Sequence, residues 1–125
     1  MADEGTDPAL GPSVRRVSDV LAAAGGGHIV VALEQPARTS AEAARAVGCR
    51  VDQIAKSLVF RGENTPGAIL VITSGANRVD ERRVAGLVAE PVARANADFV
   101  RARTGFAIGG VAPVAHAEPL RSPTP

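Results

Sequence analysis

Two short segments of this sequence carry residue types that could act on an anion or an ester. The first is QIAKSLVFRG, Gln53 to Gly62, in which Lys56 precedes an apolar run. Lys56 is the only lysine among the 14 basic residues. A lysine is a compact charge on a flexible stem, which suits contact with a phosphate or an ester. The ordinary alternative is an edge residue that packs its stem on apolar surface and keeps its ammonium in water.

The second segment is GGVAP, Gly109 to Pro113. Two adjacent glycines allow backbone N–H groups to point outward, where they can hold a carboxylate or a developing oxyanion. The alternative is that the glycines and the proline form only a tight turn.

Other chemistries find little support. His28, His116 and Cys49 lie far apart without metal-ligand spacing, so we expect no metal and no cofactor. A Cys–His nucleophile pair is formally open, but Cys49 follows a helix-ending glycine and suits a half-buried structural role. No nucleophile elbow or Walker loop occurs. Gly25–Gly27 is interpreted as a helix terminator.

Arginines form two groups in the second half of the chain. These are Arg78, Arg82 and Arg83, and then Arg94, Arg101 and Arg103. They are either a solvated face balanced by neighbouring acids or phosphate contacts that position a nucleic acid.

Length and composition limit the function classes. A chain of 125 residues is enough for one domain, and its net charge of +1 creates no global field for a polyanion. Aromatic residues make up 2%, which disfavours nucleic-acid binding on stacked aromatic platforms. The acidic N-terminus has no signal-peptide pattern and no long apolar run follows, so we expect a cytoplasmic protein without a membrane partner.

The local patterns predict a mixed α/β (α+β) domain with a curled sheet. Four helices are expected, over 13–24, 39–48, 80–87 and 96–103, with a helical turn at 51–55. The first has Ser13 as its expected N-cap and Gly25 as its C-cap, and the second begins with a Thr39–Glu42 capping box. Expected strands cover 28–33, 56–61 and 68–75, the last two joined by the hairpin-like GENTPG, and a strand-and-loop follows at 105–116. Residues 1–12 are expected to be a flexible lead-in, 13–120 the domain and 121–125 a tail.

Several segments, in their order, resemble the YbaK/EbsC family of prolyl-tRNA-editing-domain-like aminoacyl-tRNA deacylases. They are IAKSLVF, ILVITSGANRVDE and ANADFVRARTGFAIGGVAPVAH, and the resemblance runs from about Ser13 to Leu120. It implies a curved, barrel-like mixed sheet surrounded by short helices. It also implies a trans-acting hydrolase that cleaves the ester of a mischarged aminoacyl-tRNA, with proline tRNA carrying Ala, Cys or a similar small amino acid as the expected substrate.

The resemblance also implies a site. Lys56 would anchor the tRNA 3′ end rather than act as nucleophile, and the loop from Gly109 to Pro113 would hold the aminoacyl carbonyl. Strand alternation suggests a pocket lined by Leu58, Phe60, Ile72 and Ile108. The expected catalytic groups are Lys56, Gly109 and Gly110, and the expected substrate contacts are Ser57, Leu58, Phe60, Ser74, Val111, Pro113 and His116. For His116 a surface position is an equal alternative.

The chain also departs from the family pattern. Relatives continue for some tens of residues where this chain reads HAEPLRSPTP, so we expect either a shortened chain or a partner that completes the sheet, with an exposed sheet edge. The functional alternative is a non-catalytic module that binds the aminoacyl-tRNA end, or an inactive relative. The implied partners are the acceptor end of a misacylated tRNA and a prolyl-tRNA synthetase. The edited amino acid and the oligomeric state stay open.

Overall fold

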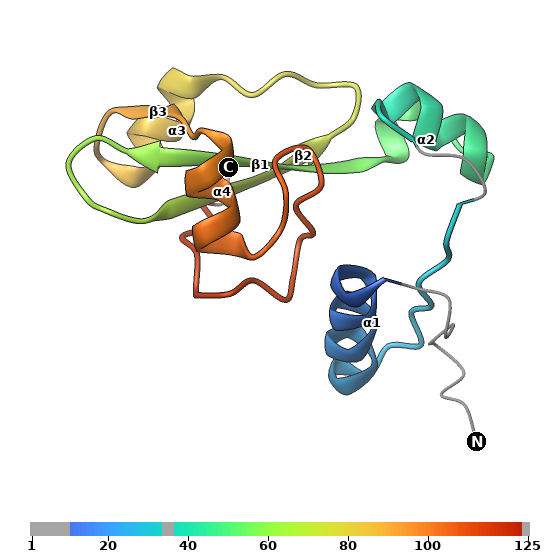
Figure 1. Ribbon diagram of the computed structural model, residues 1–125. Coiled ribbons are helices and arrows are strands. Elements are labelled where there is room, and N and C mark those ends of the chain that lie inside the picture. The colour runs from blue at the N-terminus through green and yellow to red at the C-terminus, as the bar shows by residue number, and fades with distance from the viewer. Residues whose placement is uncertain (1–10, 34–36, 124–125) are drawn as a thin grey trace. The chain divides into compact units, whose positions relative to one another are not determined.

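The computed structural model describes residues 11–33 and 37–123, which belong to two compact units, 1–36 and 37–125. The described part of the first unit contains helix α1, Pro12–Ala24 (Figure 1). The helix was expected, but Ser13 is not its N-cap, because Gly11 holds that position and Pro12 begins the helix. Proline suits the first helical turn, where its missing N–H costs nothing. The predicted C-cap, Gly25, is confirmed with φ 77°.

The predicted strand at 28–33 is wrong. These residues have no regular secondary structure and pair with none of the described strands. Ile29 and Val31 are 66% and 73% exposed, so the apolar run is not buried in a sheet. A β-branched run raises strand propensity, but a strand also needs a partner for its backbone groups. Residues 1–10, most of the predicted lead-in, lie outside the described residues.

The second unit begins with α2, Ser40–Val47, and a 3₁₀ turn η1, Val51–Gln53. The Thr39 hydroxyl accepts a hydrogen bond from the Glu42 N–H at 3.1 Å, as predicted. The Glu42 carboxylate in turn accepts from the N–H of Arg38, one residue before the expected partner. Gly48 ends α2 in the left-handed conformation, which glycine adopts without strain.

The sheet has three strands in the order β2-β1-β3, all antiparallel. The predicted hairpin is confirmed as β1, Ala55–Gly62, and β2, Ala68–Ser74. Strand β3, Val92–Arg94, was not predicted. No described residue of the expected strand-and-loop at 105–116 belongs to a strand, so only its loop part is confirmed.

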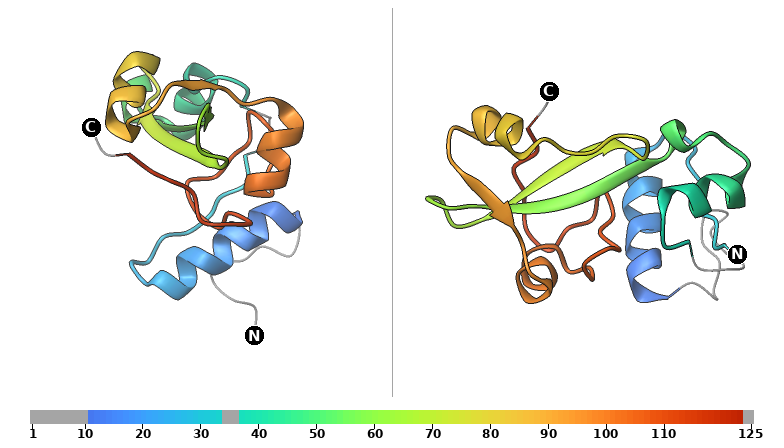
Figure 2. Two further views of the ribbon diagram at one scale, coloured as in Figure 1. Left: turned by 90° about the vertical axis from the view of Figure 1, so that its left-hand side faces the viewer. Right: turned by 90° about the horizontal axis from the view of Figure 1, so that it is seen from above.

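Two short helices cover the sheet. Helices α3, Glu81–Val88, and α4, Ala97–Thr104, begin at the predicted caps Asp80 and Asn96. Both views of Figure 2 place α3 and α4 on opposite faces of the sheet. The core cluster is formed by Phe60 of β1, Ile69 of β2 and Val84 of α3. None of the described helices is long and apolar enough to span a membrane.

The two edges of the sheet differ. The outer edge of β2 is partly covered, because the Arg121 N–H donates to the Ala68 carbonyl and the Arg121 carbonyl accepts from the Leu70 N–H. On the other side β3 pairs only with the last residues of β1, Phe60 to Gly62. The half of β1 that contains Lys56 therefore has no strand on this side among the described residues.

A buried carboxylate ties the C-terminal segment to the hairpin. The Glu90 side chain is 5% exposed and accepts hydrogen bonds from the N–H groups of Asn64 and Thr65, each at 2.9 Å. It also forms an ion pair with the Arg121 guanidinium at 2.9 Å. These contacts, with Thr65 contributing most, lower the pKa of Glu90 from 4.5 to about 2. The carboxylate thus stays charged at neutral pH and holds three separate segments together.

Candidate functional site

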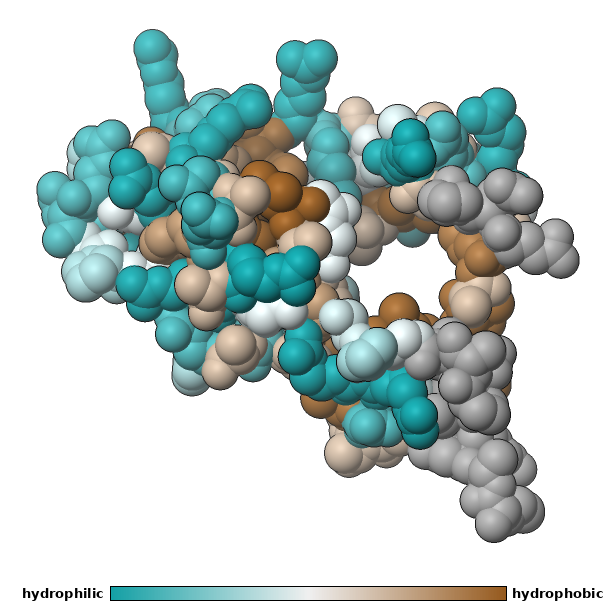
Figure 3. Space-filling model, in the orientation of Figure 1, coloured by the Kyte–Doolittle hydropathy of each residue, from teal (hydrophilic) through white to brown (hydrophobic). Residues whose placement is uncertain are grey.

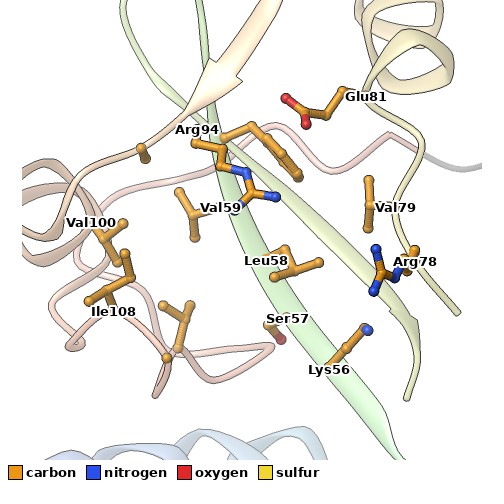
Figure 4. A pocket seen from close by; sticks show the side chains of 14 residues that line it. Lys56, Ser57, Leu58, Val59, Arg78, Val79, Glu81, Arg94, Val100 and Ile108 are labelled. Carbon is orange, nitrogen blue, oxygen red and sulfur yellow. The ribbon is translucent and has the colours of Figure 1, made fainter. Parts of the chain in front are cut away.

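A cavity of about 550 Å³ lies along β1, within the second unit, and includes the half of the strand that β3 does not pair with. Its volume falls in the range of roughly 300–1,000 Å³ that is typical of small-molecule sites. In Figure 4, β1 passes between Arg78 and Val79 on one side and Val100 and Ile108 on the other. The remaining lining residues are Lys56, Ser57, Leu58, Val59, Phe60, Glu81, Arg94, Ala95, Gly109 and Val111.

The shortness of β3 creates this cavity. The Gly75 N–H donates to the Ile54 carbonyl, so the position of Ile54 is hydrogen-bonded to the β2 side. In an antiparallel pair every second residue of a strand points its N–H and C=O groups at the partner strand, and the residues between them point these groups the other way. In the register of β1 with β2, the backbone groups of Ser57 and Val59 therefore point away from β2. They border the cavity where β3 no longer pairs with β1. A ligand in the cavity could therefore hydrogen-bond to the strand itself.

The cavity wall is positively charged. It carries Lys56, Arg78 and Arg94, with Glu81 as the one acidic lining residue. Among the described residues, none of the three cations takes part in an ion pair. Three positive groups lie on a wall that also has an apolar part, with Leu58 and Ile108 in it, which suits a ligand with one anionic group and one small apolar group.

The loop after α4 supplies backbone donors. Gly109 has φ 81°, a conformation that favours glycine, and both Gly109 and Val111 line the cavity. The Gly110 N–H donates to the Ala107 carbonyl at 2.9 Å and is already engaged. Within the described part of the chain, the N–H groups of Gly109 and Val111 have no hydrogen-bond partner. These two N–H groups are therefore available to a substrate oxygen.

This loop is fixed at both ends by Thr104, which is fully buried. The Thr104 hydroxyl donates to the Val100 carbonyl at 2.7 Å and accepts from the Phe106 N–H at 3.0 Å. The Thr104 carbonyl accepts from the Ala117 N–H at 2.9 Å. One residue thus closes the base of the loop that carries Gly109.

A comparison with protein families shows to which family the chain belongs. The sequence profile of the aminoacyl-tRNA editing domain matches residues 34–122, which is more than half of the chain. The chain belongs to this family. The resemblance seen in the sequence is therefore confirmed. The mixed α/β fold described above agrees with the fold class that the sequence predicted.

Solved structures and one curated relative add detail. A protein described as a candidate trans-editing enzyme for prolyl-tRNA synthetase is 50% identical, with a TM-score of 0.83 over 91% of this chain and 72% of that one. A scaffold used for computational epitope grafting is 48% identical, with a TM-score of 0.80 over 90% and 71%. The uncharacterized protein YwhH of Bacillus subtilis (strain 168) is 32% identical over 67% of this chain. The chain spans about half, 53%, of YwhH.

The editing domain brings most of the predicted site residues together. Lys56, Ser57, Leu58, Phe60, Ile108, Gly109 and Val111 all line the cavity. Gly110 adjoins it in the loop, and Pro113 lies beyond the lining residues. The nitrogen Nε2 of His116 lies 2.7 Å from the Ala112 carbonyl oxygen, so the half-buried imidazole contacts the loop rather than the cavity wall.

Two predicted contacts lie elsewhere. The Ser74 hydroxyl donates to the Asp52 carbonyl at 2.9 Å and accepts from the Ala76 N–H, so it stabilises the end of β2. Ile72 is 47% exposed and lines a second cavity. Alternation assigns Ile72 to a face of the sheet but cannot show that the cavity follows the opposite edge.

The sequence argument did not place Arg78 and Arg94 at the site. Each was recognised as part of an arginine group, but α3 separates them in the chain. Only the pairing of β3 with β1 brings Arg94 to the cavity, opposite Phe60. The clustering of arginines around predicted helix ends indicated possible phosphate contacts, but it could not show that Arg78 and Arg94 are the two that line the cavity.

Proposed function

We propose that the chain is a trans-acting editing hydrolase that cleaves the ester of a mischarged aminoacyl-tRNA. Proline tRNA carrying alanine, cysteine or another small amino acid is the first candidate substrate. Membership of the aminoacyl-tRNA editing domain family supports the class of substrate. The relative described as a candidate trans-editing enzyme for prolyl-tRNA synthetase, at 50% identity, supports the choice of tRNA. A prolyl-tRNA synthetase, as the source of the mischarged tRNA, is the proposed second partner, and the cytoplasm the proposed compartment.

The single observation that carries this proposal is the meeting of Lys56 with Gly109 and Val111 in one cavity. Lys56, with Arg78 and Arg94, would bind the phosphate of the 3′-terminal nucleotide. Charge-assisted hydrogen bonds of this kind are about twice as strong as neutral ones. The unpaired N–H groups of the loop would then face the aminoacyl carbonyl.

The reaction needs little machinery, because an aminoacyl ester is already activated. A water molecule adds to the ester carbonyl and loses a proton to solvent, and the carbonyl oxygen becomes an oxyanion. The N–H groups of Gly109 and Val111 would stabilise that oxyanion, and one such donor contributes about 3 kcal/mol to the transition state. The bond from the carbonyl carbon to the ribose oxygen then breaks, and that oxygen takes up a proton. The products are the free amino acid and a tRNA with a free hydroxyl.

Selection by size would come from the apolar part of the wall. Phe60 is 6% exposed and belongs to the core, so its ring cannot move aside without disturbing the packing against Ile69 and Val84. Forcing extra volume into a packed site costs about 1–3 kcal/mol. A small side chain such as that of alanine would fit against Leu58 and Ile108, while the proline ring would be excluded.

The test is hydrolysis of proline tRNA charged separately with Ala, Cys, Ser and Pro. We expect the chain to hydrolyse at least one wrong ester and to spare the Pro ester. The competing function is a module that binds the aminoacyl-tRNA end without turnover. Folded protein that binds the charged tRNA but hydrolyses none of the four esters would establish that alternative and overturn the proposal.

A further inference from the structure

A second cavity adjoins the first. It has a volume of about 370 Å³ and lies between β2 and α3; we call it the β2–α3 groove. Its walls include Ile72 of β2 and Arg83 and Leu87 of α3. Arg78 and Val79, in the connection between β2 and α3, line both cavities. The two cavities are therefore neighbours, with Arg78 and Val79 between them.

The groove combines apolar surface with positive charge. Ile72 and Leu87 are 47% and 46% exposed, so their side chains offer apolar surface that a ligand could cover. Within the described residues, neither Arg78 nor Arg83 takes part in an ion pair. The one acidic wall residue, Asp80, is engaged as the N-cap of α3, where its carboxylate accepts from the N–H groups of Arg82 and Arg83. Bound anions would thus meet little competition from the protein.

Apolar surface beside a cation matches the chemistry of a nucleotide. A nucleobase can bury its apolar face against aliphatic side chains, and its phosphate can pair with a guanidinium. Two consecutive nucleotides share one phosphodiester, which lies between their nucleosides. Arg78 occupies the corresponding position between the two cavities.

We propose that the β2–α3 groove binds the penultimate nucleotide of the tRNA acceptor end. In this arrangement the terminal adenosine lies in the first cavity, Arg78 binds the phosphate between the two nucleosides, and Arg83 and Leu87 contact the penultimate nucleotide. The inference rests on the proposed function for the identity of the RNA. It does not require that the chain hydrolyse anything.

The first test is the affinity for an uncharged acceptor-stem minihelix of proline tRNA ending in CCA, measured by fluorescence anisotropy. Arg83→Ala should raise the Kd about five- to ten-fold, the range expected for loss of one partly exposed charged contact. Arg82→Ala is the matched control, because Arg82 is the adjacent arginine of α3 and lines neither cavity. It should change the Kd less than two-fold. Equal effects of the two substitutions, or no binding by the wild type, would overturn the proposal.

The second test asks whether the groove recognises the base. An abasic site at the penultimate position should weaken binding to the wild type about five-fold, the effect of losing about 40 Å² of apolar contact at roughly 25 cal/mol per Å². It should weaken binding to Leu87→Ser much less, because the contact is already lost. Such a double-mutant cycle isolates the pairwise contact. Additive losses would show that Leu87 and the base do not meet. Neither test involves an ester. Binding of the penultimate nucleotide in the groove can therefore be established even if the chain hydrolyses no ester, and it can be refuted even if editing is established.

Discussion

The imidazole Nε2 of His116 lies 2.7 Å from the carbonyl oxygen of Ala112. Because a carbonyl can only accept, the Nε2 must carry the proton of this hydrogen bond. The imidazole also meets the Phe106 ring edge to face, with centroids 6.2 Å apart. His116 therefore braces the loop that presents Gly109 and Val111 to the cavity, and it does so without lining the cavity itself.

If this brace positions the loop, His116→Ala should lower kcat about three- to ten-fold, which is the cost of one neutral hydrogen bond. The KM for the tRNA should change little, because the cations of the wall are untouched. His116→Gln keeps an N–H donor and should recover part of the rate. Single-turnover deacylation with both variants checks this. Equal rates for the alanine and glutamine variants would show that the hydrogen bond has no positioning role.

The hydroxyl of Thr104 should matter for stability. Thr104→Val keeps the shape but removes the hydroxyl that donates to the Val100 carbonyl and accepts from the Phe106 N–H, and the loss of two buried hydrogen bonds should cost about 1–3 kcal/mol. Thr104→Ser retains the hydroxyl and serves as the control. Urea denaturation followed by circular dichroism measures the free energy of unfolding. Similar losses in the two variants would point to packing of the methyl group rather than to the hydrogen bonds.

Glu90 should make stability depend on acid. Its folded pKa of about 2 lies below the ordinary value of 4.5, so the folded state binds fewer protons than the unfolded state between these values. The stabilisation is complete above about pH 5 and is lost as the pH falls toward 2. Glu90→Gln should lower stability at pH 7 and flatten its fall in that window.

Thermal unfolding at intervals from pH 7 to pH 2.5 measures this dependence. Glu118→Gln is a suitable control, because the Glu118 carboxylate forms an ion pair with Arg103 in which its side chain is 41% exposed. That variant should keep the acid dependence of the wild type. An unchanged acid dependence in Glu90→Gln would assign the effect to other carboxylates.

Two glycine substitutions should have opposite signs. A Cβ atom on Gly75 would lie 2.8 Å from the Val51 carbonyl oxygen and 2.7 Å from the Ser40 Cβ, so Gly75→Ala should destabilise by about 1–3 kcal/mol. At Gly86, inside α3, nothing lies within 4 Å of the added atom. Gly86→Ala should stabilise by about 0.5–1 kcal/mol through helix propensity. The denaturant midpoint should fall in Gly75→Ala and rise in Gly86→Ala, each compared with the wild type. Shifts of the same sign in both variants would contradict this prediction.

Local signals predicted the elements that they control. Asp80, Asn96 and Gly105 act within a few residues of themselves, so the helix ends that they cap could be found in the sequence. Strand β3 has three residues and no pattern of its own; it exists because β1 offers it a partner. The apolar run at 28–33 shows the converse, since it has a good strand pattern but stays irregular, with no partner strand among the described residues.

The site was predicted in part for a similar reason. Lys56 and Gly109 were assigned to the site because the short segments that contain them resemble, in their order, segments of the family. Arg78 and Arg94 reach the same cavity only through the order of strands in the sheet, which no local pattern encodes. The bracing of the loop by His116 depends on a turn at Ala115, where φ is 67°, a conformation that alanine rarely adopts and that the sequence does not signal.

The most direct test of the proposed editing site is the deacylation rate of Lys56→Ala on alanine-charged proline tRNA, with Arg82→Ala as a folded control that lies outside the cavity. If Lys56 anchors the tRNA end, its removal should lower kcat/KM at least ten-fold, since a charged contact contributes about 1.5–3 kcal/mol. Arg82→Ala should match the wild type. A folded Lys56→Ala protein that hydrolyses the ester at the wild-type rate would contradict the assignment of this cavity as the editing site.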